Sequence, residues 1–562
     1  MKPPENQRWD QETMLVAWAA ALVSFTSFFH YYRRSEILLY GDAVAHIGIA
    51  RRVIDSLTPG LLQLGTVWLP LPHLLMIPFL LSDKMWVTGV GGSIGSMAAF
   101  VFGALGIFRL VRGTLAAAGE PGTEVRTAAW LAALIYLANP NLVYLQSTAM
   151  TEAIYLAFFI WTIVHFSEFV REGENASLMK SGWCLAAACL TRYDGWLLAG
   201  MMCAVALVLA RPGGARVRQA FVRFALLAAA APVFWLAYNA IIYRNPLEFA
   251  NGPYSAKAIE QRTSTPGSAP HPGLHNLRIA ESYFIKSAEL NLAQGNWGRL
   301  WLLFALAGLG AGFLLQTEKA AIQTEPGPRN SKNKIAVTPA FWPLLPLATP
   351  LLFYPISIAY GGVPIFLPVW WPYSIYNARY GLQLLPAFTV LTALLVFFLM
   401  TKAANRRGRI AVVATSVVLV ALSYAWVWRA QPICFREAWI NSRTRIALEG
   451  EVAAYLDGLP ARSTLLMYLG DHAGALERAG IPIRRVINEG NHRVWKQPSD
   501  PEGLWERALA EPEKYADYVI AMEGDPVWKA VQNHPLRPIA VIHVSGQPKA
   551  VIYRTGRGNH TR

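Results

Sequence analysis

The sequence carries little charge for its length. Only 15% of its 562 residues are Asp, Glu, Lys or Arg, whereas soluble domains average about 25%. Hydrophobic residues make up 54% of the chain, and the mean hydropathy is +0.30. This composition excludes an ordinary soluble domain and predicts an integral membrane protein.

Cysteine is also scarce. The four cysteines form neither a disulfide framework nor the spacing of a metal site, since three lie inside apolar runs and one follows the last run. These residues are Cys184, Cys189, Cys203 and Cys434. A phosphate-binding glycine loop is not predicted either. The stretch "GVGGSIGS" at 89–96 lies within an apolar run, where small residues let helices pack closely.

Two further features are missing from the sequence. No internal repeat indicates the inverted-repeat architecture of many transporters. The polar segment "MKPPENQRWDQET" is followed by an apolar run that is nearly long enough to span and has no small-residue cleavage site. We therefore expect this run to stay in the membrane rather than act as a cleaved signal.

The chain is nevertheless strongly basic, with a net charge of +15 and a pI of about 9.6. A basic chain is one mark of nucleic-acid binding. Here the Lys and Arg residues lie mostly in short breaks between apolar runs, as membrane topology requires. We therefore predict a lipid bilayer, and no nucleic acid, as a partner.

Long apolar runs are what the sequence has in abundance. About 20 residues suffice for a helix to cross a bilayer, so these runs predict about eleven transmembrane helices. Two of the runs are short, which leaves the count open by one or two. The runs lie at about 14–32, 86–108, 127–138, 150–168, 178–191, 195–210, 220–243, 298–316, 339–360, 380–400 and 410–430.

Lys and Arg concentrate in alternate gaps between these runs, for example at 211–223, 319–334 and 402–409. By the positive-inside rule these gaps face the cytoplasm, together with the N-terminus. The intervening gaps, such as 244–297, then face outward. An odd number of spans also places the C-terminal segment outside.

Three outward segments are predicted to be more than connections. Residues 33–85 hold a short, proline-rich apolar stretch that is typical of an interfacial helix, anchored by Trp68 and Trp86. Residues 244–297 have the Gly, Pro and Ser content of a mobile lid. From 431 to 562, helical periodicity alternates with short β-branched runs, which predicts a small α/β domain outside a membrane domain at 1–430.

Ionisable residues gather at the predicted outer ends of separate helices, in "GDAVAH", "AMTEA", "LTRYDG" and "NARYG". Charges near hydrocarbon are costly and tend to line cavities or pathways. Because these groups share one side of the membrane, we expect a common polar cavity that opens outward. The candidate residues are Asp42, His46, Arg51, Arg52, His73, Glu152, Arg192, Asp194 and Arg379.

The acids and the histidine in this set also have structural interpretations. Asp42 suits the N-cap of a following helix, and Glu152 is favoured near the start of its own helix. His46 lies one turn from Asp42 on the same face, where a lone histidine is more often a satisfied interface residue. Taken singly, these positions do not decide between structure and chemistry.

The same holds for the arginines. Arg51 is placed to contact lipid phosphates, and Arg192 to pair with Asp194 across a tight turn. Arg379 is placed to anchor the chain at the interface beside Tyr380. Taken together, the acids and arginines suit a reaction that needs a carboxylate base and a positive charge for an anion.

At these residues the sequence resembles the C-type (GT-C) membrane glycosyltransferases. This superfamily includes protein O-mannosyltransferases, aminoarabinose transferases and oligosaccharyltransferases. The similarity is carried by "YGDAVAHIGIARR" after the first span, "VWLPLPHLLMIPF" after it, "TRYDG" between two later spans and "NARYGLQLLPAF" opening a late one. It extends along the whole chain in layout, although each motif is short.

The resemblance implies an all-α polytopic membrane enzyme that moves a sugar from a polyprenyl-phosphate donor to a protein, lipid or glycan acceptor. It implies that Asp42 is the base of an inverting reaction, and that Arg379, with Arg192 second, binds the donor phosphate. Apolar grooves between helices are expected to hold the polyprenyl tail. The remaining substrate-binding candidates are His46, Arg51, His73, Glu152, Asp194 and Tyr380.

The sequence departs from the family in one respect. The mannosyltransferases and aminoarabinose transferases commonly have Asp-Glu where this chain has Asp42 followed by Ala43. Fewer acids are then available to hold a divalent ion, so we predict no metal or other cofactor. A monosaccharide on a monophosphate carrier is the expected donor.

Two other functions remain open from the sequence. A transporter or flippase for a lipid-linked sugar would use the same arginines to hold phosphate. A non-catalytic assembly protein would use its outer domain to bind cell-wall polymers. Short loops and a small outer domain favour the inner membrane of a bacterium as the location.

Overall fold

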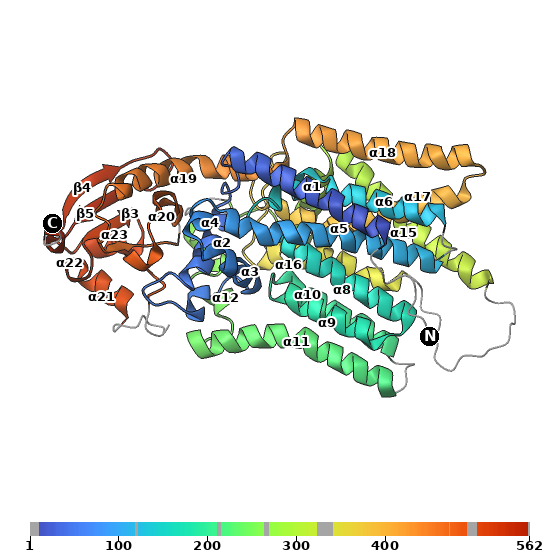
Figure 1. Ribbon diagram of the computed structural model, residues 1–562, viewed down its shortest axis with the longest axis horizontal. Coiled ribbons are helices and arrows are strands. Elements are labelled where there is room, and N and C mark those ends of the chain that lie inside the picture. Colours follow the sequence, from blue (N-terminus) through green and yellow to red (C-terminus); the bar gives the residue numbers. More distant parts are fainter. Residues whose placement is uncertain are drawn as a thin grey trace.

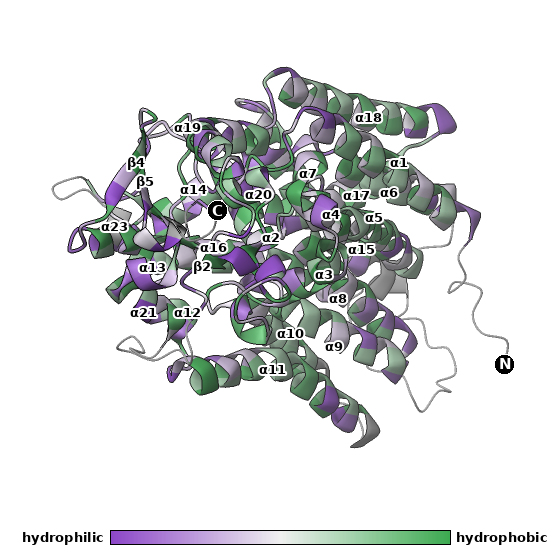
Figure 2. Cartoon of the chain, turned by 60° about the vertical axis from the view of Figure 1, so that its left-hand side comes forward, coloured by the Kyte–Doolittle hydropathy of each residue, from purple (hydrophilic) through white to green (hydrophobic). Residues whose placement is uncertain are grey.

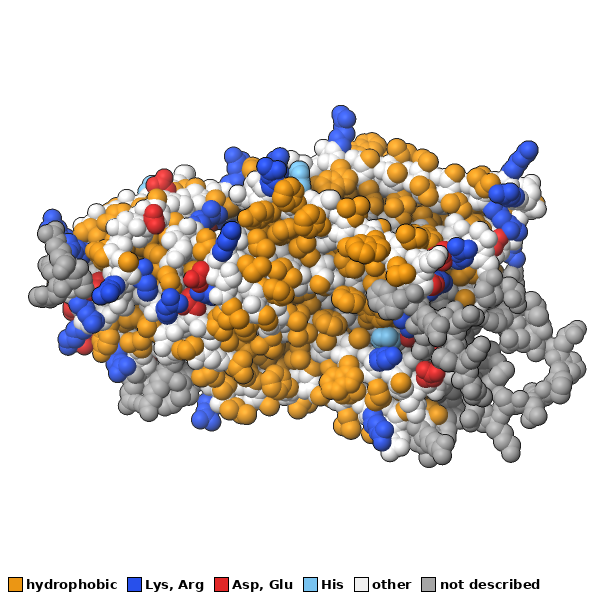
Figure 3. Space-filling view, in the orientation of Figure 1, with side chains coloured by type: hydrophobic (Ala, Val, Ile, Leu, Met, Phe, Trp, Pro, Cys, Tyr) orange, Lys and Arg blue, Asp and Glu red, His pale blue; other side chains and the backbone are white. Residues whose placement is uncertain are grey.

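The computed structural model describes residues 10–118, 122–210, 215–263, 269–322, 341–470, 472–491 and 503–559. A helical bundle forms one end of the molecule and a small domain with a sheet forms the other (Figure 1). Hydrophobic side chains cover the flank of the bundle, and Lys and Arg gather toward its two ends (Figure 3). This surface is that of a multi-pass membrane protein.

Each predicted apolar run is a helix in the structure. The bundle helices are α1 (Gln11–Arg33), α5 (Val90–Ala118), α6 (Thr123–Leu137), α8 (Glu152–Glu172), α9 (Asn175–Cys189), α10 (Asp194–Ala210), α11 (Ala215–Tyr243), α15 (Trp297–Ile322), α16 (Thr349–Tyr360), α17 (Leu385–Lys402) and α18 (Arg406–Arg429).

Among the described residues, eight helical segments are long and apolar enough to cross a membrane. The predicted runs outside those eight form α6, α9 and α10, which have 15, 15 and 17 residues. Helix α8 is largely enclosed by the other bundle helices, with Phe159, Phe166 and Phe169 fully buried. Helix α1 instead exposes apolar residues such as Trp18 and Leu22, as a lipid-facing helix does.

Shorter helices fill the space between the bundle and the sheet domain. They are α2 (Gly41–Arg52), α3 (Leu71–Leu80), α4 (Asp83–Val87), α7 (Pro140–Leu145), α12 (Glu248–Asn251), α13 (Ala256–Thr263) and α14 (Leu277–Leu292). The 3-10 helices η2 (Leu61–Leu64) and η4 (Ala378–Leu384) join them, whereas the 3-10 helix η3 (Trp342–Ala348) precedes α16 within the bundle. These elements carry the predicted outward segments, and α2, α3 and α4 lie where the two parts meet (Figures 1 and 2).

Two details of the outward segments differ from the prediction. Trp86 is buried under the Arg51 guanidinium and does not anchor the segment in lipid. Trp68 packs at a tilt against the His46 ring. Residues 277–292 of the predicted lid form α14, whose N-cap Asn276 accepts a hydrogen bond from the Ile279 amide at 3.1 Å. Helix α14 packs against η4 and α16, so this part of the segment is integral to the bundle.

The C-terminal part begins with a long helix, α19 (Ile433–Asp457), which contacts α7 and η4 at its start and α20 (Gly474–Ala479) further on. A mixed five-stranded sheet follows in the order β2-β1-β3-β5-β4. Strands β1 and β2 pair in parallel, as do β1 and β3, whereas β5 pairs antiparallel with β3 and β4.

The sheet domain is completed by η5 (Ile483–Arg485), α21 (Leu504–Ala510), α22 (Pro512–Tyr515), α23 (Pro526–Val531) and η6 (Gly556–Asn559). Its strands are β1 (Leu465–Met467), β2 (Val486–Ile487), β3 (Tyr518–Met522), β4 (Arg537–Ile542) and β5 (Ala550–Arg554). An all-α membrane bundle with a small α/β domain is therefore the observed architecture, as predicted.

Candidate active site

Arg379 is the centre of a group of charged side chains between the bundle and α2. Its Nη2 donates to Oδ2 of Asp42 at 2.6 Å, and its Nη1 donates to Oε1 of Glu437 at 2.6 Å. Its Nε lies 3.3 Å from Oε1 of Glu152. One guanidinium thus links carboxylates from α2, α8 and α19, which are far apart in the sequence.

Arg192 extends this group to a second guanidinium. Its Nη1 donates to Oε1 of Glu152 at 3.1 Å, and its Nη2 donates to the Tyr354 hydroxyl at 3.0 Å. Its Nε lies 3.5 Å from Oδ1 of Asp194. The other oxygen of Asp194, Oδ2, accepts a hydrogen bond from the Tyr354 hydroxyl at 2.8 Å. We call Asp42, Glu152, Arg192, Asp194, Arg379 and Glu437 the acid–arginine cluster.

Tyr380 separates the two positive charges. Its ring lies under the guanidinium of Arg379 at 5.0 Å and under that of Arg192 at 5.2 Å. Tyr40 covers another part of Arg379, at 5.2 Å. An aromatic face attracts a cation, so Tyr380 lowers the cost of placing two arginines in one site.

Local backbone structure explains how Arg379 reaches this position. Asn377 precedes η4 in the left-handed region, with φ of 55°, and its amide donates to Oε1 of Glu437 at 3.1 Å. A Cβ on Gly381 would lie 2.3 Å from the Ala288 amide nitrogen, so only glycine allows η4 to pack this closely on α14. The stretch "NARYG" therefore provides a turn, a functional arginine and a close packing contact.

Asp42 differs from the other carboxylates of the cluster in exposure. Its side chain is 42% exposed, whereas those of Glu152, Asp194 and Glu437 are 0%, 1% and 1% exposed. Asp42 is also not a helix cap, because the N-cap of α2 is Tyr40. It lies in the first turn of α2, where a carboxylate is favoured by the helix dipole. Asp42 is thus the acid of the cluster that a substrate can reach.

The two predicted histidines contact each other beside the cluster. Nδ1 of His46 lies 2.8 Å from Nε2 of His73, and the His46 ring packs at a tilt against Trp68, with ring centroids 4.5 Å apart. Burial, with the positive charges of Arg192 and Arg379, lowers the pKa of His46 to about 3. His46 is therefore a neutral hydrogen-bonding group at physiological pH.

The structure does not join Arg51 to the cluster. Arg51 is 4% exposed and donates to Asp55 at 2.9 Å, and it also pairs with Asp83 and stacks on Trp86. Asp55 in turn accepts hydrogen bonds from the amide and side chain of Arg484 in the C-terminal domain. These contacts make Arg51 part of the link between α2 and that domain, and its predicted substrate contact is left without support.

Sequence reasoning missed three residues of the site: Tyr40, Tyr354 and Glu437. Glu437 lies seven residues beyond the last predicted span, and nothing in the sequence indicates that α19 returns to η4. The two tyrosines have no charge to mark them. The one sequence signal for Glu437 is that it follows the apolar residues 433–435 closely.

Among the residues that the structure describes, no group of three or more His, Cys, Asp or Glu side chains is arranged to hold a metal ion. The cluster contains two arginines for its four carboxylates, which provide positive charge without a metal. Metal-independent chemistry stays a prediction of the sequence.

Comparisons with known proteins identify the fold. No protein-family model matches the sequence, and no curated protein matches it. Among solved structures, ArnT from Cupriavidus metallidurans bound to undecaprenyl phosphate matches with a TM-score of 0.53 and 13% identity. The match covers 96% of this chain and 97% of that chain, and ArnT in the apo state gives the same values. The chain therefore shares the overall fold of ArnT over nearly its whole length.

Proposed function

We propose that the protein transfers a sugar from a polyprenyl-phosphate donor to an acceptor at the outer face of the membrane, with inversion at the anomeric carbon. The observation that carries this proposal is the exposed Asp42 carboxylate held by Arg379 at 2.6 Å, at the junction of bundle and outer domain. ArnT, which shares the fold, binds undecaprenyl phosphate in its solved structure.

The reaction needs one proton acceptor and one group that stabilises a leaving anion. An acceptor hydroxyl attacks the anomeric carbon while the bond from that carbon to the phosphate oxygen breaks. Asp42 takes the hydroxyl proton, and the bonding electron pair leaves with the polyprenyl phosphate. General-base assistance of this kind contributes about 10²–10⁴-fold to the rate. The guanidinium groups of Arg379 and Arg192 neutralise the charge that develops on the phosphate.

The ion pair between Asp42 and Arg379 couples donor binding to base activation. A donor phosphate that takes Nη2 of Arg379 removes the counter-ion of Asp42. A carboxylate without its cation is a stronger base. Glu437 and Glu152 keep Arg379 in place during this exchange, because they hold its other nitrogens. Asp42 is thus released to accept the hydroxyl proton when the donor is in the site.

The proposed location is the inner membrane of a bacterium. Helix α2 and the C-terminal domain lie at one end of the bundle, and the junction of α17 and α18 lies toward the other (Figure 1). That junction carries Lys402, Arg406, Arg407 and Arg409. The positive-inside rule then supports a cytoplasmic N-terminus and an outer C-terminal domain. The polyprenyl tail would lie among the apolar bundle helices.

The test uses purified protein in nanodiscs with radiolabelled polyprenyl-phosphate sugars and a membrane acceptor fraction. Wild type is expected to move label from lipid to acceptor, and Asp42→Asn to lose this by 10²-fold or more, at about the lower limit for a general base. Asp457→Asn, at the exposed end of α19, is the control. Wild-type transfer by Asp42→Asn would refute the mechanism. Donor that binds and crosses the membrane without being consumed would indicate a flippase.

A further inference from the structure

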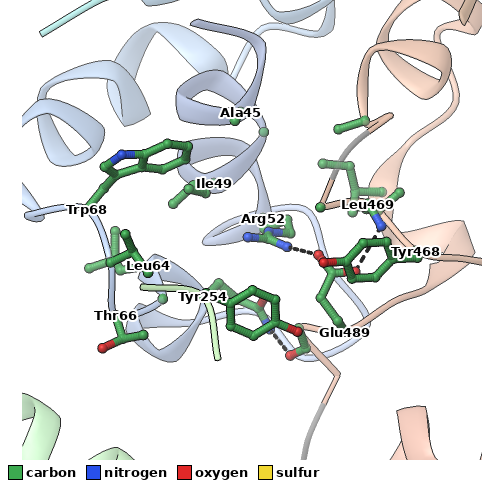
Figure 4. A pocket seen from close by; sticks show the side chains of 18 of the residues that line it. Ala45, Ile49, Arg52, Leu64, Thr66, Trp68, Tyr254, Tyr468, Leu469 and Glu489 are labelled. Carbon is green, nitrogen blue, oxygen red and sulfur yellow. Dashed lines mark hydrogen bonds and ion pairs between the residues drawn. The ribbon is translucent and has the colours of Figure 1, made fainter. Parts of the chain in front are cut away.

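A cavity of about 490 Å³ lies between α2 and the C-terminal domain. Helix α2 and the segment around Trp68 form one side, and Tyr468 and Leu469 of the C-terminal domain form the other (Figure 4). Tyr254 enters from the outward segment at 244–297 (Figure 4). This volume is within the range of about 300–1,000 Å³ that is typical of small-molecule sites.

The wall formed by α2 continues from the catalytic end of that helix. Asp42, Ala45 and Ile49 are spaced three and seven residues apart, so they lie on one face, and Arg52 follows at the next turn. Arg52 is ten residues from Asp42, which corresponds to about 15 Å along the helix axis. A molecule in the cavity would therefore lie along this face of α2, from Ala45, close in sequence to Asp42, to Arg52 at a polar far end.

The polar groups at the far end balance in charge. Arg52 pairs with Glu489 at 3.0 Å, and the second oxygen of Glu489 accepts from the Leu469 amide at 2.9 Å. Nε of Arg52 and Oε1 of Gln63 are buried and have no hydrogen-bond partner. Both residues line the cavity, so this end is polar, and the Arg52–Glu489 pair leaves it without a net charge.

The second acid on the wall, Glu477, is uncharged at neutral pH. Burial, together with the neighbouring Glu449 carboxylate, raises the pKa of Glu477 to about 8. Its Oε1 is buried without a partner. The remaining wall is mainly apolar and aromatic, with Leu64, Trp68 and Trp86. A further unpaired charge in these surroundings would be costly, because no opposite charge is left to compensate it.

We propose that this cavity binds the acceptor, and that the acceptor there is an uncharged amphipathic molecule with an apolar chain and hydroxyl or amide groups. This inference rests on the proposed sugar transfer. The polar group of the acceptor would contact Arg52 and Gln63, and its apolar chain would lie along Ile49 and Trp68. The reacting hydroxyl of the acceptor would lie toward Asp42. Arg52 and Gln63 are then specificity residues.

The first test is binding, which does not depend on transfer. A photoreactive n-decyl β-glucoside serves as the probe, with unlabelled n-decyl β-glucoside, decyl phosphate and decyltrimethylammonium as competitors. We expect labelling of wild type in nanodiscs, at peptides that include residues 44–52 or 468–477. Only the neutral competitor should reduce it more than about tenfold. Equal competition by the charged competitors would overturn the inference.

Variants separate the cavity from nonspecific apolar contact. Ile49→Trp fills the cavity and should reduce labelling at least about tenfold, whereas Leu226→Trp on the lipid-facing side of α11 should leave it unchanged. Gln63→Leu removes the unpartnered acceptor and should favour probes without hydroxyl groups. Unchanged labelling in both Ile49→Trp and Gln63→Leu would also overturn the inference.

The same preparations distinguish this inference from the proposed function. If undecaprenyl phosphate displaces the probe, the cavity holds the donor tail and the inference fails, while transfer by Asp42 stands. If the glucoside binds as expected but wild type transfers no labelled sugar, the cavity assignment of an uncharged amphipathic ligand holds and the proposed function fails. Asp42→Asn should bind the probe as wild type does.

Discussion

Asp42 and Glu437 are far apart in the sequence and share one guanidinium, that of Arg379, at 2.6 Å each. Asp42 is the exposed partner and Glu437 the buried one. A bidentate arginine bridge of this kind fixes orientation as well as charge. The position of the proposed base therefore depends on a helix, α19, that begins only after the last bundle helix.

Arg379→Lys is expected to reduce transfer strongly without unfolding the protein. A lysine ammonium is a single point charge and cannot hold two carboxylates in the geometry of a planar guanidinium. Loss of one preorganised donor at a developing charge usually costs about 10²–10³-fold in turnover. The measurement is label transfer in nanodiscs, with Arg436→Lys on the adjacent position of α19 as the control. Turnover within a few-fold of wild type would remove Arg379 from the mechanism.

Glu437→Gln is expected to strengthen binding of the donor phosphate. Glutamine keeps an oxygen that accepts from Arg379 and from the Asn377 amide, but it removes one negative charge from the site. An anionic donor phosphate then meets less repulsion, and we expect its Kd to fall by about tenfold, which corresponds to about 1.4 kcal/mol. Equilibrium binding of a labelled polyprenyl phosphate measures this, with exposed Glu281→Gln on α14 as the control. Weaker binding by Glu437→Gln would contradict this account.

The sequence allowed much of the cluster to be predicted, for a physical reason. Asp42, Glu152 and Arg192 each lie at the end of an apolar run, and alternation of Lys- and Arg-rich gaps assigns these ends to one side. Glu437 was not predicted because its helix starts where the hydropathy falls, so no apolar run indicates its depth relative to the membrane. Such a contact between distant segments depends on tertiary packing.

Helical periodicity explains why Arg51 lies apart from the acid–arginine cluster. It lies nine residues after Asp42, and at 3.6 residues per turn this places it half a turn away, on the opposite face of α2. The structure accordingly pairs it with Asp55 and Asp83 instead of with the cluster. The cavity has no comparable sequence pattern, because three segments from different parts of the chain form its walls.

Gly92→Ala is expected to destabilise the protein and displace α2. A Cβ at this position of α5 would lie 2.6 Å from Cγ1 of Ile47 and 2.7 Å from Cβ of Ala149. Overpacking of this kind typically costs about 1–3 kcal/mol. Gly200→Ala on α10 is the matched control, since a Cβ there meets nothing within 4 Å. The control should gain up to about 1 kcal/mol from helix propensity.

Thermal unfolding in detergent measures both glycine variants. We expect a lower Tm and reduced transfer for Gly92→Ala, because Ile47 lies on the helix that carries Asp42. A Tm for Gly92→Ala at or above that of Gly200→Ala would show that α5 and α2 leave room for a methyl group at this position.

Glu477 is expected to make the folded protein less stable as the pH rises. Its pKa is raised from 4.5 to about 8 by burial and by Glu449, with Arg478 and Arg445 opposing the shift. The folded protein therefore binds a proton that the unfolded chain has released between these two values. The stabilisation from this proton is complete below pH 4.5 and is lost as the pH rises through 8.

The measurement is Tm from pH 6 to pH 9.5 for wild type and for Glu477→Gln, which mimics the protonated acid. Wild type should lose Tm across this range, and Glu477→Gln should lose distinctly less because it has no proton to release. The control is Glu451→Gln, an exposed acid of α19, which should follow wild type. Parallel curves for all three proteins would mean that Glu477 is ionised in the folded state. The cavity beside α2 would then carry a negative charge and would favour a cationic ligand over an uncharged one.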